Sequence, residues 1–199
     1  MKHSPKLLFA LTTALAAPAV DAHLVETGFG AFYDGIVHLT MTPSDLLMVL
    51  ALALFAGQCG TASARWALFA FPLGWLVGGL VGAQWPGASV LPVWTTFSFL
   101  LAGALTALGA KARHISVAAL SVLAGALHGF MNGATLGPAG ASTTALVGAV
   151  TAVFCFVAVI AAEVTALPVG WPQIAVRVVG SWIAAAGLLM LGWLARTPP

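Results

Sequence analysis

The chain has 199 residues, of which 61% are hydrophobic and only 6% are charged, and its formal net charge is +2. A soluble domain carries about a quarter charged residues, so this composition excludes an ordinary soluble protein and predicts an integral membrane protein. The small net charge, without a basic stripe in the sequence, also excludes nucleic acid as a partner. The lipid bilayer is therefore the first partner that the sequence predicts.

The N-terminus has the features of a secretory signal peptide. Lys2 and Lys6 give a basic start, Leu7 to Ala17 form an apolar run, and small residues around Ala22 form a cleavage site. We therefore expect residues 1–22 to be a signal peptide and the mature chain to begin at His23. An uncleaved first helix is the alternative, but about a dozen apolar residues are too few to span a bilayer comfortably.

Six apolar segments follow, separated by short breaks of polar residues, Pro and Gly. They cover residues 44–60, 66–83, 91–109, 115–137, 143–163 and 173–194. Most are long enough to cross a hydrocarbon core of about 30 Å. The sequence thus predicts an all-α membrane protein in which residues 23–199 form one polytopic bundle of about six transmembrane helices. Its glycine-rich faces suit a homo-oligomer, but they suit packing within the chain equally well.

Positive charges indicate how the bundle is oriented. Arg65, Lys111, Arg113 and Arg177 lie at one end of the predicted bundle, whereas the connections 84–90 and 138–142 carry no charge. By the positive-inside rule the basic end faces the cytoplasm. We therefore predict a multi-pass protein of the bacterial inner membrane, with both mature termini outside.

An interrupted apolar segment, residues 29–45, precedes the first span. Pro43 disfavours helical backbone at Thr42, and Ser44 or Asp45 can cap a new helix. This pattern predicts a broken or re-entrant segment before the span. Such elements often build the substrate sites of transporters, although an ordinary interfacial helix is an alternative.

A second polar feature lies inside the fourth apolar segment. His128 and Asn132 are four residues apart, so they share one face of a helix. A polar group inside a bilayer is costly, and it marks a path or a binding site unless it only bonds to a neighbouring helix. A groove is expected beside the pair, because glycine recurs at every fourth position: Gly125, Gly129, Gly133 and Gly137.

Helix geometry places the polar residues of these two segments at a similar depth. Counted at about 1.5 Å per residue from the basic end, Asp45 and His128 reach the same level in the outer half of the membrane. His38 lies at that level or nearer the outside. Imidazole nitrogen and carboxylate oxygen are ligands for first-row divalent metals. We therefore expect His38, Asp45 and His128 to bind a metal ion, with Asn132 ligating it or orienting a neighbour.

Other residues are weaker candidates. A mature N-terminal His23 would offer its amine and imidazole together, with Glu26 one turn along, although a solvated tail fits as well. A copper(I) site would use His23 with methionines near the predicted pocket, which otherwise face the core or the lipid: Met41, Met48 and Met131. Glu163 could pair with Arg177 at the inner end.

The sequence contains no nucleotide-binding loop, catalytic triad motif or metalloprotease motif. No enzyme activity and no permanently bound cofactor are therefore expected, and a metal ion enters the prediction only as a transported substrate.

Two motifs resemble those of the HupE/UreJ family of hydrogenase- and urease-associated nickel or cobalt permeases. The first is Gly35-Ile36-Val37-His38 followed by Ser44-Asp45-Leu46, and the second is His128-Gly129-Phe130-Met131-Asn132-Gly133. The family has a second histidine after its aspartate, where this chain has Leu46, and another where this chain has Asn132. The resemblance implies a cleaved signal, about six spans and Ni²⁺ or Co²⁺ as the transported ion.

Two hypotheses follow from the sequence. In the first, the chain is a secondary permease that takes up a divalent metal ion, nickel first and cobalt second, through a His/Asp site in the outer half of the bundle. The ion would then pass inward beside the glycine groove. In the second, the chain is a non-transporting membrane scaffold or assembly protein, in which His128 and Asn132 only bond to neighbouring helices. The two missing histidines favour the second hypothesis.

Overall fold

A computed structural model of the chain describes residues 27–88, 92–136 and 143–196, and within these ranges it contains seven helices and no strand. The helices are α2 (Ala31–Met41), α3 (Pro43–Gln58), α4 (Thr61–Gly82), α5 (Pro92–Ala107), α6 (His114–Leu136), α7 (Thr143–Ala166) and α8 (Trp171–Leu194). The predicted signal peptide lies outside the described residues.

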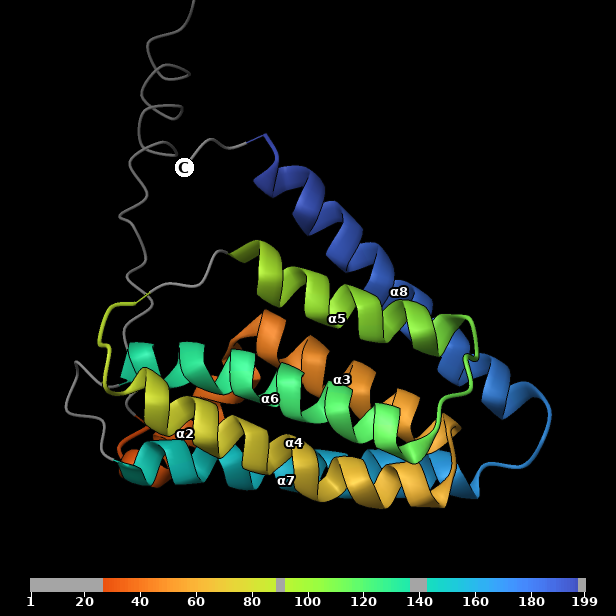
Figure 1. Ribbon diagram of the computed structural model, residues 1–199, viewed down its shortest axis with the longest axis horizontal. Coiled ribbons are helices and arrows are strands. Elements are labelled where there is room, and N and C mark those ends of the chain that lie inside the picture. Colours follow the sequence, from red (N-terminus) through yellow and green to blue (C-terminus); the bar gives the residue numbers. More distant parts are fainter. Residues whose placement is uncertain (1–26, 89–91, 137–142, 197–199) are drawn as a thin grey trace, which may run out of the picture.

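Most helices run along the long axis of the bundle, as Figure 1 shows. The closest pairs are α4 with α6, α5 with α8, and α2 with α7, and α3 contacts both α7 and α5. In Figure 1, α8 leans away from α5 towards its C-terminal end. Helix α3 therefore sits between the two halves of the bundle and can present its N-terminal residues to a shared interior.

Each of the six predicted spans is a helix, but not every helix is long enough to cross a membrane. Helices α4, α6, α7 and α8 have the length and apolarity of a span, and the bent pair α2 and α3 would make a fifth. Helix α5 has only 16 residues, or about 24 Å, which is short for a hydrocarbon core. The described residues thus support four to five spans, and the sixth stays a prediction.

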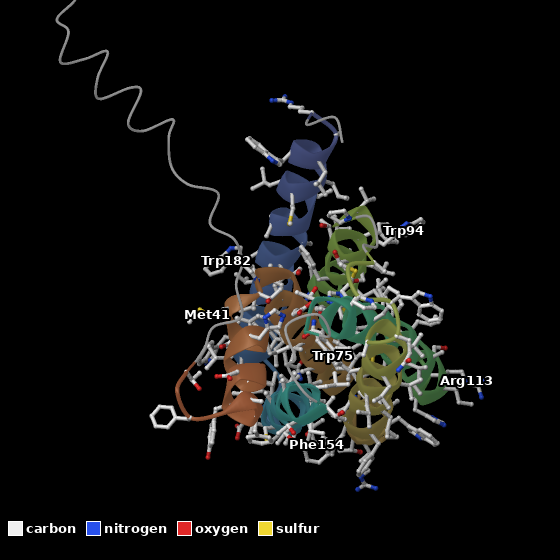
Figure 2. All side chains as sticks on the ribbon, turned by 90° about the vertical axis from the view of Figure 1, so that its left-hand side faces the viewer. Met41, Trp75, Trp94, Arg113, Phe154 and Trp182 are labelled. Carbon is white, nitrogen blue, oxygen red and sulfur yellow. The ribbon has the colours of Figure 1, made fainter. Side chains whose placement is uncertain are left out.

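The surface of the bundle is apolar, as a lipid-facing protein requires. Trp94, Phe154 and Trp182 point outward in Figure 2, and all three are exposed. Trp75 lies inside the bundle and is fully buried. Large apolar side chains that face outward over several helices are consistent with a multi-pass membrane protein.

The predicted break before the first span is confirmed. Thr42 has extended backbone angles (φ −95°, ψ 101°) between α2 and α3, which meet at 79°. Pro43 is the first residue of α3, where its missing N–H costs nothing. The Thr42 hydroxyl donates a hydrogen bond to the carbonyl oxygen of His38 (2.8 Å) and closes the end of α2.

The glycine groove predicted beside His128 is wrong, because α4 fills it. A Cβ atom on Gly125, Gly129 or Gly133 would collide with the backbone of α4 around Phe71, Trp75 and Gly79. Small residues on one helix let the backbone of the next approach closely. Helix α4 contributes matching glycines, which meet the backbone of α6 in the same way: Gly74, Gly78 and Gly82. The described part of the stripe therefore packs two helices together, and Gly137 lies outside the described residues.

Candidate functional site

A buried hydrogen bond joins the start of α3 to the second half of α6. Nδ1 of His128 donates to Oδ1 of Asp45 over 2.7 Å, and both side chains are almost completely buried. The prediction that Asp45 and His128 lie at one level of the bundle is therefore confirmed, and their place in the outer half of the membrane stays a prediction. The alternative prediction that Asp45 caps its helix is wrong, because Thr42 occupies the N-cap and the Asp45 carboxylate turns towards α6.

Asn132 completes the environment of the same carboxylate. Its Nδ2 donates to Oδ2 of Asp45 (2.6 Å) and to the carbonyl oxygen of His128 (3.1 Å). One turn of helix separates His128 from Asn132, so both reach Asp45 from one face of α6. Asn132 thus contacts the residue that it was predicted to orient, and both of its predicted roles, ligand or orienting partner, stay predictions. Its Oδ1 is buried and has no hydrogen-bond partner among the described residues.

The other side of the His128 ring is also engaged. The Ser98 hydroxyl of α5 lies 2.8 Å from Nε2, and the Trp75 ring of α4 stacks on the imidazole at 5.6 Å between ring centroids. With Nδ1 donating to Asp45, Nε2 lies within hydrogen-bond distance of the Ser98 hydroxyl, whose single O–H donates to the carbonyl oxygen of Thr95. Both ring nitrogens therefore have partners, and four helices hold the ring in place.

The order Ser98–His128–Asp45 is the hydrogen-bond order of nucleophilic hydrolases. Here His128 is fully buried, and the Ser98 oxygen also lies 2.7 Å from the carbonyl oxygen of Thr95. A carbonyl substrate would have no access to both groups together. This arrangement fixes the position of Asp45 and does not present a nucleophile.

A cavity of about 300 Å³ opens beside the carboxylate. His38 from α2 and Asp45 and Asn132 from the network lie on its wall, together with further polar and methionine side chains: Thr42, Ser44, Thr95, Thr135, Met131 and Met190. The bend between α2 and α3 brings His38 and Asp45 to the same cavity. His128 lies behind Asp45 and is not part of the wall.

The predicted ligands come together only in part. Among residues 27–88, 92–136 and 143–196, no group of three His, Cys, Asp or Glu side chains is close enough to hold a metal ion. His38 and Asp45 share the cavity, while His128 contacts Asp45 from the protein side. His23 and Glu26 lie outside the described residues. Of the predicted methionines, Met131 lines the cavity, Met48 is in the core and Met41 is exposed.

Sequence reasoning missed the contributions of α4, α5 and α8. Ser98 and Thr95 are hydroxyl residues in an apolar segment, which is the one signal that could have singled them out. Trp75 and Met190 carry no such signal, because aromatic and methionine side chains are common in any apolar helix. Only the rotation of each helix about its axis assigns these residues to the site.

The family described as HupE / UreJ protein matches residues 10–190, which is nearly the whole chain. No curated protein and no solved structure matches it. Members of the matching family are transporters or accessory proteins. Of the residues in the two motifs, His38 and Asp45 lie on the wall of the cavity, and His128 contacts Asp45 from behind it. This chain belongs to the HupE/UreJ family.

Proposed function

We propose that the chain is a permease that takes up a divalent transition-metal ion, nickel first and cobalt second, through the cavity beside Asp45. The observation that carries this proposal is the cavity itself, whose lining residues include His38, Asp45 and Asn132. Nitrogen and oxygen donors of these kinds suit Ni²⁺ and Co²⁺. The family supports metal transport in general.

The unpartnered oxygen of Asn132 supports a cation at this place. Buried polar atoms in proteins almost always have a partner, so an orphaned acceptor calls for an explanation. Oδ1 of Asn132 is such an acceptor, and the same side chain holds Asp45 through its nitrogen. A cation beside the carboxylate would satisfy both the oxygen and the negative charge.

His128 has a different role in this proposal from the one predicted from the sequence. Its two nitrogens already contact Asp45 and Ser98. To ligate an ion it would have to release one of these partners, whereas in its present position it holds the carboxylate towards the cavity. We therefore assign His38, Asp45 and Asn132 to the ion and His128 to the positioning of Asp45, as partners of ligands commonly do.

The second candidate function is a scaffold or assembly protein that does not transport. One observation favours it: both oxygens of Asp45 and both nitrogens of His128 are hydrogen-bonded within the bundle. Holding helices together is a sufficient role for a network of this kind. Transport measurements separate the two functions directly.

The test is accumulation of nickel and cobalt, measured by elemental analysis in cells that lack their own uptake systems. Wild type is compared with His38→Ala and Asp45→Asn at matched membrane expression. The controls are His114→Ala, whose imidazole stacks on Trp66 at the other end of the bundle, and Asp34→Asn, whose carboxylate accepts hydrogen bonds from Thr27. Accumulation should be lost in the first two variants and kept in the controls. No accumulation by the wild type would favour the scaffold.

A further inference from the structure

A second polar cavity, of about 280 Å³, lies at the opposite end of the bundle from Asp45. It is formed where α3 and α7 end, where α5 leads into α6, and where α8 begins, at the right of Figure 1. Its polar lining side chains are Gln58, Lys111, Thr165, Gln173 and Arg177, and we call it the basic cavity. The positive-inside rule assigns this end to the cytoplasm.

Two cations on the wall of the basic cavity are held in place by backbone carbonyls. Nζ of Lys111 donates to the carbonyl oxygen of Gln58 (2.7 Å), and Nε of Arg177 donates to that of Ala107 (2.9 Å). Arg177 also lies across Gly109, where an added Cβ atom would be 3.4 Å from its Nε. Gln58 and Ala107 are the last residues of α3 and α5. Each cation is thus anchored on one side.

These contacts use only part of what the two side chains can donate. An ammonium has three N–H donors and a guanidinium has five, and each cation uses one of them on a carbonyl. The predicted ion pair between Glu163 and Arg177 is wrong: in the described part of the chain, neither Lys111 nor Arg177 has a carboxylate within 4 Å. The basic cavity therefore carries two positive charges that the described residues do not balance.

The rest of the wall suits a ligand with more than a phosphate. The lining contains no Asp or Asn side chain. Oε1 of Gln58 is buried without a hydrogen-bond partner among the described residues. A hydroxyl beside an anionic group would satisfy it. The neighbouring residues Leu108, Trp171 and Ile174 are large, apolar and strongly exposed. Acyl chains could lie against them while a headgroup occupies the basic cavity.

We propose that the basic cavity binds a phosphate group, and that its source is the headgroup of an anionic phospholipid in the adjacent leaflet. Basic pockets between transmembrane helices on the cytoplasmic side bind such headgroups. Free phosphate shares the chemistry of the headgroup, but it would make no use of the exposed apolar side chains. The alternative without a ligand is that both cations only cap the C-terminal ends of α3 and α5. The proposal does not rest on metal transport, because it concerns other residues at the other end of the bundle.

The test is native mass spectrometry of the full chain in detergent, with phosphatidylglycerol, phosphatidylcholine or inorganic phosphate added separately. Wild type should retain phosphatidylglycerol in preference to phosphatidylcholine. The double variant Lys111→Gln/Arg177→Gln should bind phosphatidylglycerol about 30-fold more weakly, if each cation contributes as basic residues do near anionic lipid. The double variant Arg65→Gln/Arg113→Gln removes the same charge at the same end of the bundle, but outside the basic cavity. Its affinity for phosphatidylglycerol should stay close to that of the wild type.

Three results would overturn the proposal. An equal loss in the two double variants would mean diffuse attraction rather than a site. If the wild type bound phosphatidylglycerol and phosphatidylcholine equally and did not bind phosphate, helix capping would be the only role left for the two cations. This comparison uses the wild type alone, so it holds even if a variant misfolds. Wild type that binds inorganic phosphate, and shows no preference between the lipids, would overturn the lipid as the source.

Discussion

Nδ1 of His128 lies 2.7 Å from Oδ1 of Asp45, although 83 residues separate them in the chain. The contact ties the start of α3 to α6, and both side chains are buried away from solvent. A buried pair of this kind contributes little compared with two apolar residues, but the removal of one partner leaves the other unpaired at a high cost. The bundle should therefore be sensitive to single changes and less sensitive to the double change.

We expect Asp45→Ala and His128→Ala each to lower the free energy of unfolding by about 3–5 kcal/mol. The double variant should cost less than the sum, with a coupling energy of up to about 3 kcal/mol. Chemical unfolding in detergent, followed by circular dichroism, measures all three. Combining Asp45→Ala with His114→Ala supplies the control, because His114 contacts Trp66 and not the network. Additive costs for Asp45 and His128 would show that the contact is not formed.

The glycines of α4 and α6 give a second prediction. A Cβ atom at Gly129 would meet the backbone of Trp75, which cannot move without separating the two helices. Gly129→Ala should therefore lower the free energy of unfolding by about 1–3 kcal/mol. Gly192 is a helical glycine with open space around it, so Gly192→Ala should be neutral or stabilise the protein by up to about 1 kcal/mol. Thermal unfolding of both variants tests this, and equal effects would contradict the interlocked packing.

The level of Asp45 and His128 could be predicted from the sequence because both residues can be counted along continuous helices from the same basic end. The 3.6-residue period likewise placed His128 and Asn132 on one face. The bend at Thr42 could be predicted from Pro43, which disfavours helical backbone at the residue before it. In each case a local rule of helix geometry carried the prediction.

The rest depends on how helices rotate and pair. The spacing of the glycines in α6 indicated that another helix could pack closely against it. The spacing could not identify that helix as α4. Ser98 became part of the site because α5 turns that face towards His128. At the basic end of the bundle, Arg177 binds a helix-terminal carbonyl rather than Glu163. Each outcome is decided by contacts between segments that are distant in the chain, which no local pattern encodes.

A third prediction separates a ligand from a residue that positions one. His128→Gln keeps a side-chain amide that can donate to Asp45, whereas it loses the imidazole. If His128 only positions the carboxylate, this variant should weaken the apparent affinity for Ni²⁺ by about 10- to 100-fold, the range for partners of metal ligands, and His128→Ala should be worse. His38→Gln should abolish uptake. The measurement is the dependence of initial nickel uptake on nickel concentration. If His128→Gln were as inactive as His38→Gln at normal folding and expression, His128 would itself be a ligand.

The bend between α2 and α3 gives the last prediction. Pro43 keeps Thr42 out of the helical region, and this bend brings His38 to the cavity of Asp45. Pro43→Ala should lower the free energy of unfolding by only about 0.4–1 kcal/mol, mainly through the unfolded chain. It should nevertheless reduce nickel accumulation, because alanine lets the two helices straighten and moves His38 away from Asp45.

Pro172 provides the matched control for this bend, because it also lies in the first turn of a helix, at the start of α8. Pro172→Ala should cost the same stability for the same reason, and it should leave nickel accumulation unchanged, since α8 begins at the end of the bundle opposite the cavity. Unfolding and accumulation are measured on both variants in parallel. Equal accumulation by the two variants would mean that the angle between α2 and α3 does not matter to the ion, and His38 would then have to act from a position other than the wall of this cavity.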